Sequence, residues 1–440
     1  INQGRAASVT ISDSIDLIKH TVFLDLTDFS SQTKSTVCTI EFESLVDGIN
    51  TLPLDLKEQT IDSVIHASGS LNYTYSNELL DIELPTTMDA GTMDQVTVYY
   101  HGTEVTDPSG FGGFYWNSGI AYNIGVAFTD WPPSYGRAWI PCFDNFVEKS
   151  MYEFQVLTEG EITPYCNGRL QSTDTIGGDT ILTTWILDQE ISSYLASVTA
   201  SDYERIEWAF ESISGDTIPV YLAAESDDIA NLESNFENLE TVFHAFEDWF
   251  GVYRWPRIGY CMTPVGAMEH STNISYPPVL FGSGAAESVM AHELAHEWFG
   301  NLVTCDEPSD MWLNEGWAEF LSILAYEAIS GPGEYREIMR DNHYDVLHRA
   351  HYLDDGFLTM NQLPPEMTYG EHAYNKGACM AHTLRGYIGD DLFFDAMEAF
   401  LTANEFQNAS SEDLRDFLNT QPGIDVTDFF NDWIFQPGWA

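Results

Sequence analysis

The sequence predicts a multidomain α+β protein in which an N-terminal all-β domain, a sandwich or saddle, is followed by an α-rich domain. The first part of the chain is a succession of short strand patterns, whereas from about residue 226 the apolar residues recur at helical spacing. In addition, 440 residues are enough for two or three domains with hydrophobic cores of their own. We place the boundary between a β domain of residues 1–203 and a second domain of residues 204–440.

Strand patterns fill the chain from residue 8 to about residue 200. Each is a short run of β-branched and aromatic residues, and turn-forming clusters separate the runs. Clear examples of the runs and turns are residues 22–26, 36–40, 96–100, 47–48 and 177–179. Repeated short strands without intervening helical patterns predict a sandwich or saddle.

Helical patterns dominate the second half. In residues 229–246 the apolar side chains recur at three- and four-residue steps, which indicates an amphipathic helix. One short strand pattern, residues 258–262, lies among the helices. Further helical patterns cover residues 286–303, 315–329, 333–350, 374–388, 391–403 and 411–419.

The composition is strongly acidic. Sixteen Lys and Arg residues against 69 Asp and Glu residues give a net charge of −53. Such a surface repels phosphate backbones and anionic lipids, so we expect no nucleic acid or membrane partner. The acidic residues are scattered along the chain, which favours adaptation to a salty medium over a local field that attracts cationic substrates, and both explanations stay open.

Apolar runs and cysteines bear on the compartment. No apolar run approaches the roughly 18 residues of a membrane span, so we expect a soluble protein without a membrane span, and a monomer. A secreted or periplasmic location is favoured over a cytoplasmic one. The six cysteines include no C-x-x-C pair, which argues against a structural zinc knuckle, and their wide spacing fits disulfides and buried thiols equally well.

A metal-binding pattern, H-E-x-x-H, occupies residues 292–296 within a helical segment. His292 and His296 are one helical turn apart, so both imidazoles project from one face and can hold a single ion. Glu293 is rotated by about 100° from His292 and can reach a water molecule without being a ligand. Nineteen positions after His296, Glu315 begins the next helical pattern and would complete a set of two imidazoles and one carboxylate, which suits Zn²⁺. We therefore predict one Zn²⁺ per chain, with a ligand position left open for water or substrate.

These residues resemble the aminopeptidase N family of gluzincin metallopeptidases, in which the H-E-x-x-H helix is followed after eighteen residues by N-E-G-W-A, here residues 314–318. Four more segments are similar to family motifs and occur in the same order: residues 137–144 with P-C-x-D, 266–270 with G-A-M-E-N, 374–378 with Y-x-K-G-A, and the closing residues 433–438. The resemblance implies a thermolysin-like catalytic domain and removal of single residues from peptides with a free N-terminus.

Two catalytic roles follow from the resemblance. Glu293 would be the general base that takes a proton from the attacking water and later delivers it to the leaving amine. Tyr374 would donate a hydrogen bond to the developing oxyanion. An alternative for Tyr374 is an aromatic side chain that only packs on a helix, but its match to the Y-x-K-G-A motif favours catalysis.

The Gly-Ala-Met-Glu-His segment would bind the substrate. Glu269 would hold the cationic α-amino group and so select chains that end there. Gly266 and Ala267 lack bulk and would let the backbone run beside the peptide. Met268 and aromatic residues near positions 128–139 would line the first specificity pocket. His270 stands where the family usually has Asn, which would change hydrogen bonding near the amine or add a titrating group.

Two further departures from the family pattern concern the amine pocket and the length. The family contributes a Glu or Gln from the β domain to this pocket, and the corresponding place here holds Pro132, so Asp130 two positions away is the candidate substitute. Relatives commonly continue into a small β domain and a helical domain that roofs the site, whereas this sequence ends at Ala440. A cleft without that roof is expected to be more open to long peptides.

Three alternative functions compete with an aminopeptidase. A zinc-less peptide-binding relative is disfavoured by the intact ligand and base residues. An epoxide hydrolase is expected to need basic residues from the absent helical domain. An endopeptidase is disfavoured by Glu269. The sequence does not rank the N-terminal side chains that the enzyme would prefer.

Overall fold

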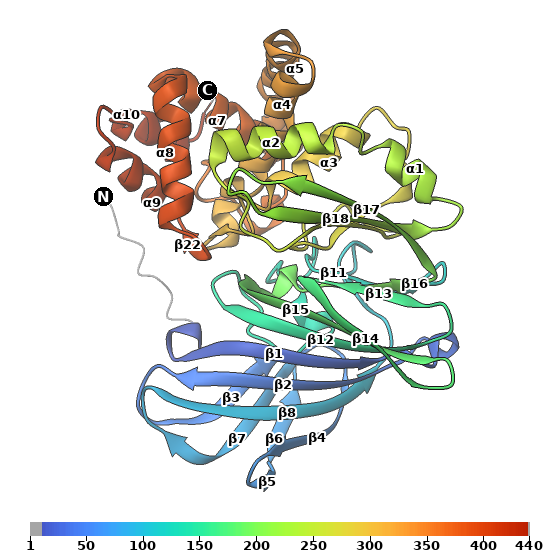
Figure 1. The fold of residues 1–440 in the computed structure, drawn as a ribbon. Helices are drawn as coiled ribbons and strands as arrows, with labels where there is room; N and C mark the ends of the chain where they lie inside the picture. The colour runs from blue at the N-terminus through green and yellow to red at the C-terminus, as the bar shows by residue number, and fades with distance from the viewer. Residues whose placement is uncertain (1–10, 439–440) are drawn as a thin grey trace.

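In the computed structural model, residues 15–201 form the β-rich lower part of the molecule in Figure 1, and the helices lie together above it. The structure describes residues 11–438, so the outer ends of the two expected domains, residues 1–10 and 439–440, lie outside the described residues. An all-β part followed by an α-rich part confirms the predicted fold class.

Three sheets make up the β-rich part. The eight-stranded sheet has the order β14 (Arg169–Gly177), β15 (Thr180–Ser192), β12 (Lys149–Glu159), β1 (Ile15–Asp25), β2 (Lys34–Ser44), β8 (Thr92–Gly102), β4 (Thr60–His66) and β5 (Gly69–Ser70). The other two are β3 (Ile49–Asp55), β7 (Leu79–Met88) and β6 (Tyr73–Ser76), and then β13 (Thr163–Cys166), β16 (Val198–Ser201), β11 (Ile120–Ile124), β10 (Gly113–Asn117) and β9 (Val105–Thr106).

Strict alternation of burial explains why these segments are strands with one core face. Along β2, Cys38, Ile40 and Phe42 are buried while the residues between them are partly exposed. Successive side chains of a strand point to opposite faces, so this pattern buries one face against the neighbouring sheet. The β1–β12 pair is parallel and the other pairs of the eight-stranded sheet are antiparallel.

The second part contains a four-stranded sheet with helices packed on it. Its strands, in spatial order, are β17 (Tyr203–Glu211), β18 (Thr217–Glu225), β19 (Ile258–Met262) and β20 (Ile274–Tyr276). A small parallel pair joins β21 (Val303–Cys305) to β22 (Gln407–Ala409). The α-helices are α1 (Ile229–Ser234), α2 (Leu239–Phe250), α3 (Ala286–Ala295), α4 (Glu315–Ile329), α5 (Pro332–Asp345), α6 (His351–Leu353), α7 (Gly377–Ile388), α8 (Asp390–Ala403), α9 (Ser411–Thr420) and α10 (Thr427–Phe429).

Short helical turns connect these elements. The π-helical turns are η7 (Val346–Ala350), η9 (His372–Lys376) and η10 (Phe430–Ile434). The 3₁₀ turns are η1 (Ile11–Asp13), η2 (Phe29–Ser31), η3 (Gly136–Ala138), η4 (Ser193–Leu195), η5 (Pro278–Leu280), η6 (Pro308–Leu313) and η8 (Pro365–Met367). No helix in residues 11–438 is long and apolar enough to cross a membrane. All six cysteines are buried and free.

Two predicted helices differ from the observed ones. The pattern over residues 229–246 is two helices, α1 and α2, separated by a short turn. The pattern over residues 286–303 stops being helical at Ala295. The chain turns at Gly300, whose φ of +120° suits glycine, and then enters β21. The apolar residues after Ala295 are buried, so their spacing reflects burial in the core and not a continued helix.

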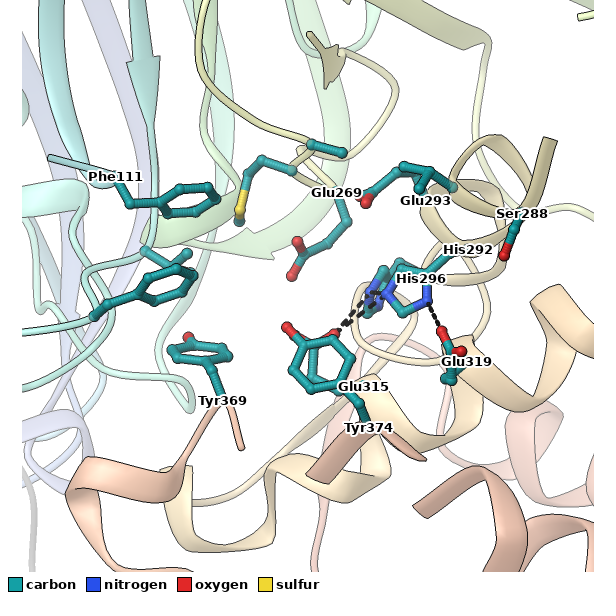
Figure 2. A pocket seen from close by; sticks show the side chains of 15 residues that line it. Phe111, Glu269, Ser288, His292, Glu293, His296, Glu315, Glu319, Tyr369 and Tyr374 are labelled. Carbon is teal, nitrogen blue, oxygen red and sulfur yellow. Dashed lines mark hydrogen bonds and ion pairs between the residues drawn. The ribbon is translucent and has the colours of Figure 1, made fainter. Parts of the chain in front are cut away.

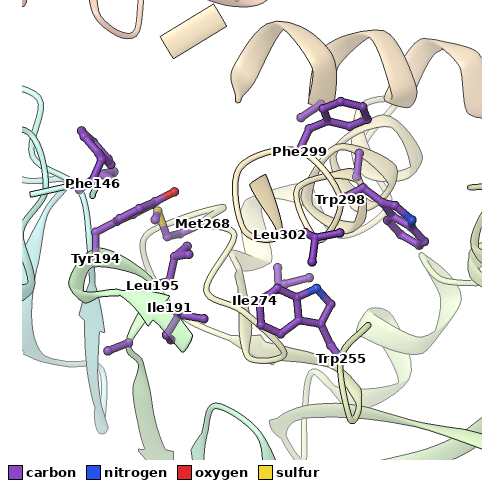
Figure 3. Packing of buried hydrophobic residues seen from close by; sticks show 14 of the residues in the cluster. Phe146, Ile191, Tyr194, Leu195, Trp255, Met268, Ile274, Trp298, Phe299 and Leu302 are labelled. Carbon is purple, nitrogen blue, oxygen red and sulfur yellow. The ribbon is translucent and has the colours of Figure 1, made fainter. Parts of the chain in front are cut away.

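The sheets change close to the expected domain boundary. The five-stranded sheet includes β16, which ends at Ser201, and the four-stranded sheet begins with β17 at Tyr203. The boundary itself stays a prediction. The two parts share one hydrophobic core, because Phe146, Tyr194 and Leu195 from the first pack in the same cluster as Trp298 and Leu302 from the second (Figure 3). This shared core joins the parts on either side of the cavity described below.

Helices α4 and α7 touch backbone to backbone at a pair of glycines. A Cβ atom added to Gly377 would lie 2.6 Å from the Cα of Gly316, and the reverse distance is the same. We expect Gly377→Ala to force the helices apart and to lower the free energy of unfolding by about 1–3 kcal/mol, measured by urea denaturation. Gly386→Ala is the matched control, since it lies on the same helix with nothing within 4 Å, and it should stabilise by about 0.5–1 kcal/mol. Equal stability of the two variants would contradict this packing argument.

Candidate active site

Two helices bring the three predicted metal ligands together (Figure 2). Helix α3 carries His292 and ends one residue before His296, and the Nε2 atoms of these two imidazoles lie 3.1 Å apart. Glu315 is the first residue of α4, and its Oε2 lies 3.4 Å from Nε2 of His292 and 3.3 Å from Nε2 of His296. The three donor atoms therefore converge on one point.

The spacing of these donors fits Zn²⁺. Tetrahedral zinc sites have Zn–N distances of about 2.0–2.1 Å, which correspond to donor–donor distances of about 3.3 Å. The observed separations of 3.1, 3.3 and 3.4 Å agree with that geometry. Two imidazole nitrogens and one carboxylate oxygen are also the donor types that zinc takes in catalytic sites, where a fourth position stays open.

The histidines are oriented by partners on their outer nitrogens. Nδ1 of His292 lies 3.1 Å from Oε2 of Glu319, and Nδ1 of His296 lies 3.0 Å from the carbonyl oxygen of Phe299. A proton on each Nδ1 leaves the Nε2 lone pair free for a metal. Glu319 was missed in the sequence, although it follows Glu315 by four residues and so shares the same face of α4.

Electrostatic interactions keep the ligand carboxylate charged. Burial raises the pKa of Glu315, but the nearby charges and hydrogen bonds of His296 and His292 outweigh burial and lower the pKa to about 2. Burial lowers the pKa of His292, but hydrogen bonds to Glu315 and Glu319 raise it well above its ordinary value. Glu315 is therefore an anionic donor near neutral pH.

Glu293 is a buried carboxyl group, and one of its two oxygens has no hydrogen-bond partner among the described residues. Its side chain lines the same cavity, the residue is only 6% exposed, and within residues 11–438 its Oε2 atom has no hydrogen-bond partner. Burial raises its pKa to about 8, against the opposing effect of His292 and His296. Buried polar atoms are normally paired, so an unpaired carboxyl oxygen in a cavity marks a group that is kept available for chemistry.

Glu269 faces the same cavity from another segment. One of its carboxylate oxygens, one of Glu293 and a ring nitrogen of His296 all lie within 4.8 Å of one another. Its backbone carbonyl accepts a hydrogen bond of 2.9 Å from Asn301 Nδ2, which connects this segment to the turn after α3. Burial raises the pKa of Glu269, and the positive field of His296 opposes that rise.

The rest of the Gly-Ala-Met-Glu-His segment divides into two groups. Ala267 and Met268 line the cavity. Gly266 does not, but its φ of +142° is one that glycine accepts readily, and a Cβ there would lie 3.3 Å from Cβ of Ser275. Its role is therefore to allow the turn of the segment.

His270 is not among the residues that line the cavity. Its Nε2 accepts a hydrogen bond of 3.2 Å from the backbone N–H of Gly125 in the β-rich part, and its Nδ1 lies 3.3 Å from Oγ of Ser275. Burial lowers its pKa to about 3, so the imidazole is neutral at physiological pH. His270 therefore forms a neutral link between the two parts of the molecule, and of the two expected alternatives this does not fit a titrating group beside the amine.

Asp130 is also placed differently from the expectation. Its carboxylate accepts hydrogen bonds from Lys57 Nζ at 2.9 Å and from the Tyr135 hydroxyl at 2.8 Å, and it is not among the residues that line the cavity. The ion pair with Lys57 holds the Asp130 carboxylate within the β-rich part of the molecule. We leave Asp130 out of the amine pocket.

Tyr374 lies in the π-helical turn η9 and lines the cavity. Its ring stacks on that of His292, with centroids 5.9 Å apart and planes inclined by 17°. Burial raises its pKa well above the ordinary value, so the hydroxyl keeps its proton and can donate it in a hydrogen bond. Asp354 fixes the start of this turn, since its carboxylate accepts hydrogen bonds from the backbone N–H groups of Glu371 and His372.

The cavity has a volume of about 290 Å³ and is lined by fifteen residues. One side holds the three metal ligands together with Glu293 and Glu319. Aromatic and apolar side chains line the other side: Phe111, Val126, Phe128 and Tyr369. Phe128 falls within the segment of aromatics expected to line the pocket, whereas Phe111, Val126 and Tyr369 were not predicted from the sequence. An H-E-x-x-H helix that supplies metal ligands, and a carboxylate beside them that is not a ligand, in one concave site, are the features of a metallopeptidase.

Comparisons with known families identify the peptidase family to which the chain belongs. The model of the peptidase M1 N-terminal domain matches residues 18–195, and that of the peptidase family M1 domain matches residues 234–433. The chain belongs to peptidase family M1. The predicted resemblance is thereby confirmed, and Zn²⁺ is the ion that the family and the donor set indicate.

Similar proteins are longer than this chain or share its two-part fold. Glutamyl aminopeptidase of Mus musculus is 28% identical over 337 residues, which are 71% of this chain and 35% of that protein. Endoplasmic reticulum aminopeptidase 1 of Homo sapiens is 26% identical over 361 residues, 71% of this chain and 38% of that protein. The chain thus spans little more than a third of the length of these relatives.

Solved structures match over almost the whole chain. A mutant M1 zinc metallopeptidase of Deinococcus radiodurans bound to a Tyr-Ser-Ala substrate superposes with a TM-score of 0.83 at 18% identity, covering 97% of this chain and 95% of that one. A two-domain M1 zinc metallopeptidase mutant bound to L-tryptophan gives a TM-score of 0.82 at 19% identity, with coverage of 97% and 95%. At this identity the likeness supports the fold.

Proposed function

We propose that the protein is a zinc aminopeptidase that hydrolyses the first peptide bond of peptides with a free N-terminus. The observation that carries the proposal is the position of Glu269, whose carboxylate shares one cavity with the three ligand residues and Glu293. A carboxylate so close to the reaction centre can bind a cationic α-amino group only when the chain ends there. Binding of a tripeptide and of a free amino acid by the similar structures supports the same substrate class.

His292, His296 and Glu315 would hold the zinc, with Glu319 keeping His292 in the required tautomer. When bound, Zn²⁺ supplies a Lewis acid that polarises the scissile carbonyl and activates water. Glu293 takes a proton from the attacking water and passes it to the leaving amine as the bond to carbon breaks.

Two other groups hold the reacting peptide. Tyr374 donates its hydroxyl proton in a hydrogen bond to the oxygen on which negative charge develops. Glu269 holds the α-amino group, so that the first carbonyl is the one presented to Glu293 and its water. The predicted monomeric state and the secreted or periplasmic location belong to this proposal and remain predictions.

The proposal is tested with a panel of aminoacyl-chromophore amides, assayed with and without a chelator. We expect hydrolysis that falls to background on chelation and returns when Zn²⁺ is added, because the donor set then regains its ion. The same peptides with an acetylated N-terminus should be inert. Full activity of chelated, metal-free protein, or equal cleavage of acetylated and free peptides, would refute the proposal.

Glu269→Gln is expected to lower kcat/KM for free peptides by about 10- to 100-fold, since a hydrogen bond to a charged group contributes about 1.5–3 kcal/mol. Steady-state kinetics measure this loss. The matched control is Glu240→Gln, the same change at an exposed position of α2, which should leave kcat/KM unaltered. An unchanged kcat/KM in the Glu269 variant would remove this carboxylate from amine binding.

A further inference from the structure

The side of the cavity opposite the metal ligands is an aromatic wall, formed by Phe111, Phe128 and Tyr369. The rings of Phe111 and Phe128 stack with centroids 4.3 Å apart and planes inclined by 7°, and those of Phe128 and Tyr369 lie 5.1 Å apart. Figure 2 shows Phe111 and Tyr369 on one side of Glu269, and His292 and Glu293 on the other. A residue whose amine is bound by Glu269 can therefore turn its side chain toward the aromatic wall while its carbonyl faces the metal ligands.

The aromatic wall is built on a fixed loop. Asp107 is only 1% exposed, and its carboxylate accepts hydrogen bonds from the backbone N–H groups of Phe128 at 3.1 Å, Thr129 at 3.2 Å and Asp130 at 2.8 Å. This carboxylate joins the segment that carries Phe111 to the segment that carries Phe128. The rings are consequently held in place before a substrate arrives, which reduces the entropy lost on binding.

Phe128 nevertheless remains 48% exposed. A large apolar side chain that is held rigidly at the mouth of a cavity gains contacts when an apolar group covers it. Val126 and Met268 add apolar surface beside it. Aromatic rings favour stacked or edge-on partners, so a ring or a branched aliphatic chain is the natural occupant.

The charges of the cavity disfavour an acidic side chain on the N-terminal residue of the substrate. Among the fifteen lining residues there is no Lys or Arg, whereas four are glutamates: Glu269, Glu293, Glu315 and Glu319. An acidic side chain on the N-terminal residue would lose its hydration without gaining a cationic partner, in a site that already carries negative charge.

We propose that the enzyme prefers aromatic or large aliphatic N-terminal residues and discriminates against acidic ones, with Phe128 as the main specificity-determining residue. This inference rests on the proposed aminopeptidase function. It names the substrate class of that same site.

The first test compares kcat/KM for Phe, Leu, Ala, Arg and Glu aminoacyl amides of one chromophore. We expect Phe and Leu to exceed Ala by about 10-fold or more, as hydrophobic pockets discriminate to this extent, and Glu to be the poorest substrate. A higher kcat/KM for Glu or Arg than for Phe would overturn the inference while leaving the proposed function intact. Absence of hydrolysis for all five would instead refute the proposed function.

The second test uses Phe128→Ala, which removes a half-exposed side chain and should not disturb folding. We expect kcat/KM to fall by about 10-fold for the Phe substrate and to change less than about twofold for the Ala substrate. Trp131→Ala is the matched control, since Trp131 is 54% exposed, lies three positions further along and does not line the cavity. An equal fall for the Phe and Ala substrates, or the same selective fall in the control, would show that Phe128 does not set the preference.

Discussion

Replacement of Glu293 by Gln is expected to leave a folded protein that still binds Zn²⁺ and hydrolyses peptides about 10²- to 10⁴-fold more slowly. Glutamine has nearly the same shape, and Glu293 is not one of the three ligands, so the metal site should stay intact. What is lost is the carboxylate, the one basic group of this side chain that can take a proton from water. Steady-state kinetics, circular dichroism and elemental analysis for zinc test the three parts of this expectation.

Glu287→Gln is a suitable control for this experiment. Glu287 lies on the same helix α3, is hydrogen-bonded to Asn238 and does not line the cavity. The same loss of charge there should leave kcat within about twofold. If the Glu293 variant kept most of its activity, another group would be the base, and if it lost its zinc, Glu293 would be acting in metal binding.

Features that depend on spacing within one helix could be predicted from the sequence. His292, Glu293 and His296 lie within five residues, and the α-helix alone decides which face each occupies. Glu315 could be predicted because it begins the next helical pattern. The strand at residues 258–262 is observed with the predicted bounds, since a short run of buried residues is typical of a strand in a covered sheet.

Features that depend on tertiary partners could not be predicted in this way. The position of Asp130 is set by its hydrogen bond with Lys57, which is 73 residues away in sequence. The position of His270 is set by its hydrogen bond with Gly125, which is 145 residues away. Spacing along the chain contains no information about which of several acceptors a charge will find. The contribution of Phe111 has the same origin, because a loop of the β-rich part reaches the cavity of the other part. The aromatics expected near residues 128–139 include Phe128, but that expectation rests on the family resemblance and not on spacing along the chain.

Tyr374→Phe is expected to lower kcat by about 10²- to 10³-fold while KM changes little, because the lost hydrogen bond forms with charge that exists mainly in the transition state. The Phe ring can keep the stacking on His292, so the ligand geometry and zinc content should be retained. The ratio of kcat values for the two proteins on one good substrate measures the effect, and KM from the same curves separates it from ground-state binding.

Tyr387→Phe supplies the control, since Tyr387 is 55% exposed on α7 and does not line the cavity. That variant should match the parent in kcat and KM. A Tyr374 variant with unchanged kcat would leave the ring as a packing element, and a variant in which KM alone rises would assign the hydroxyl to substrate binding. Loss of kcat at constant KM distinguishes an oxyanion donor from both, because only a group that interacts with the developing charge changes the barrier without changing the bound state.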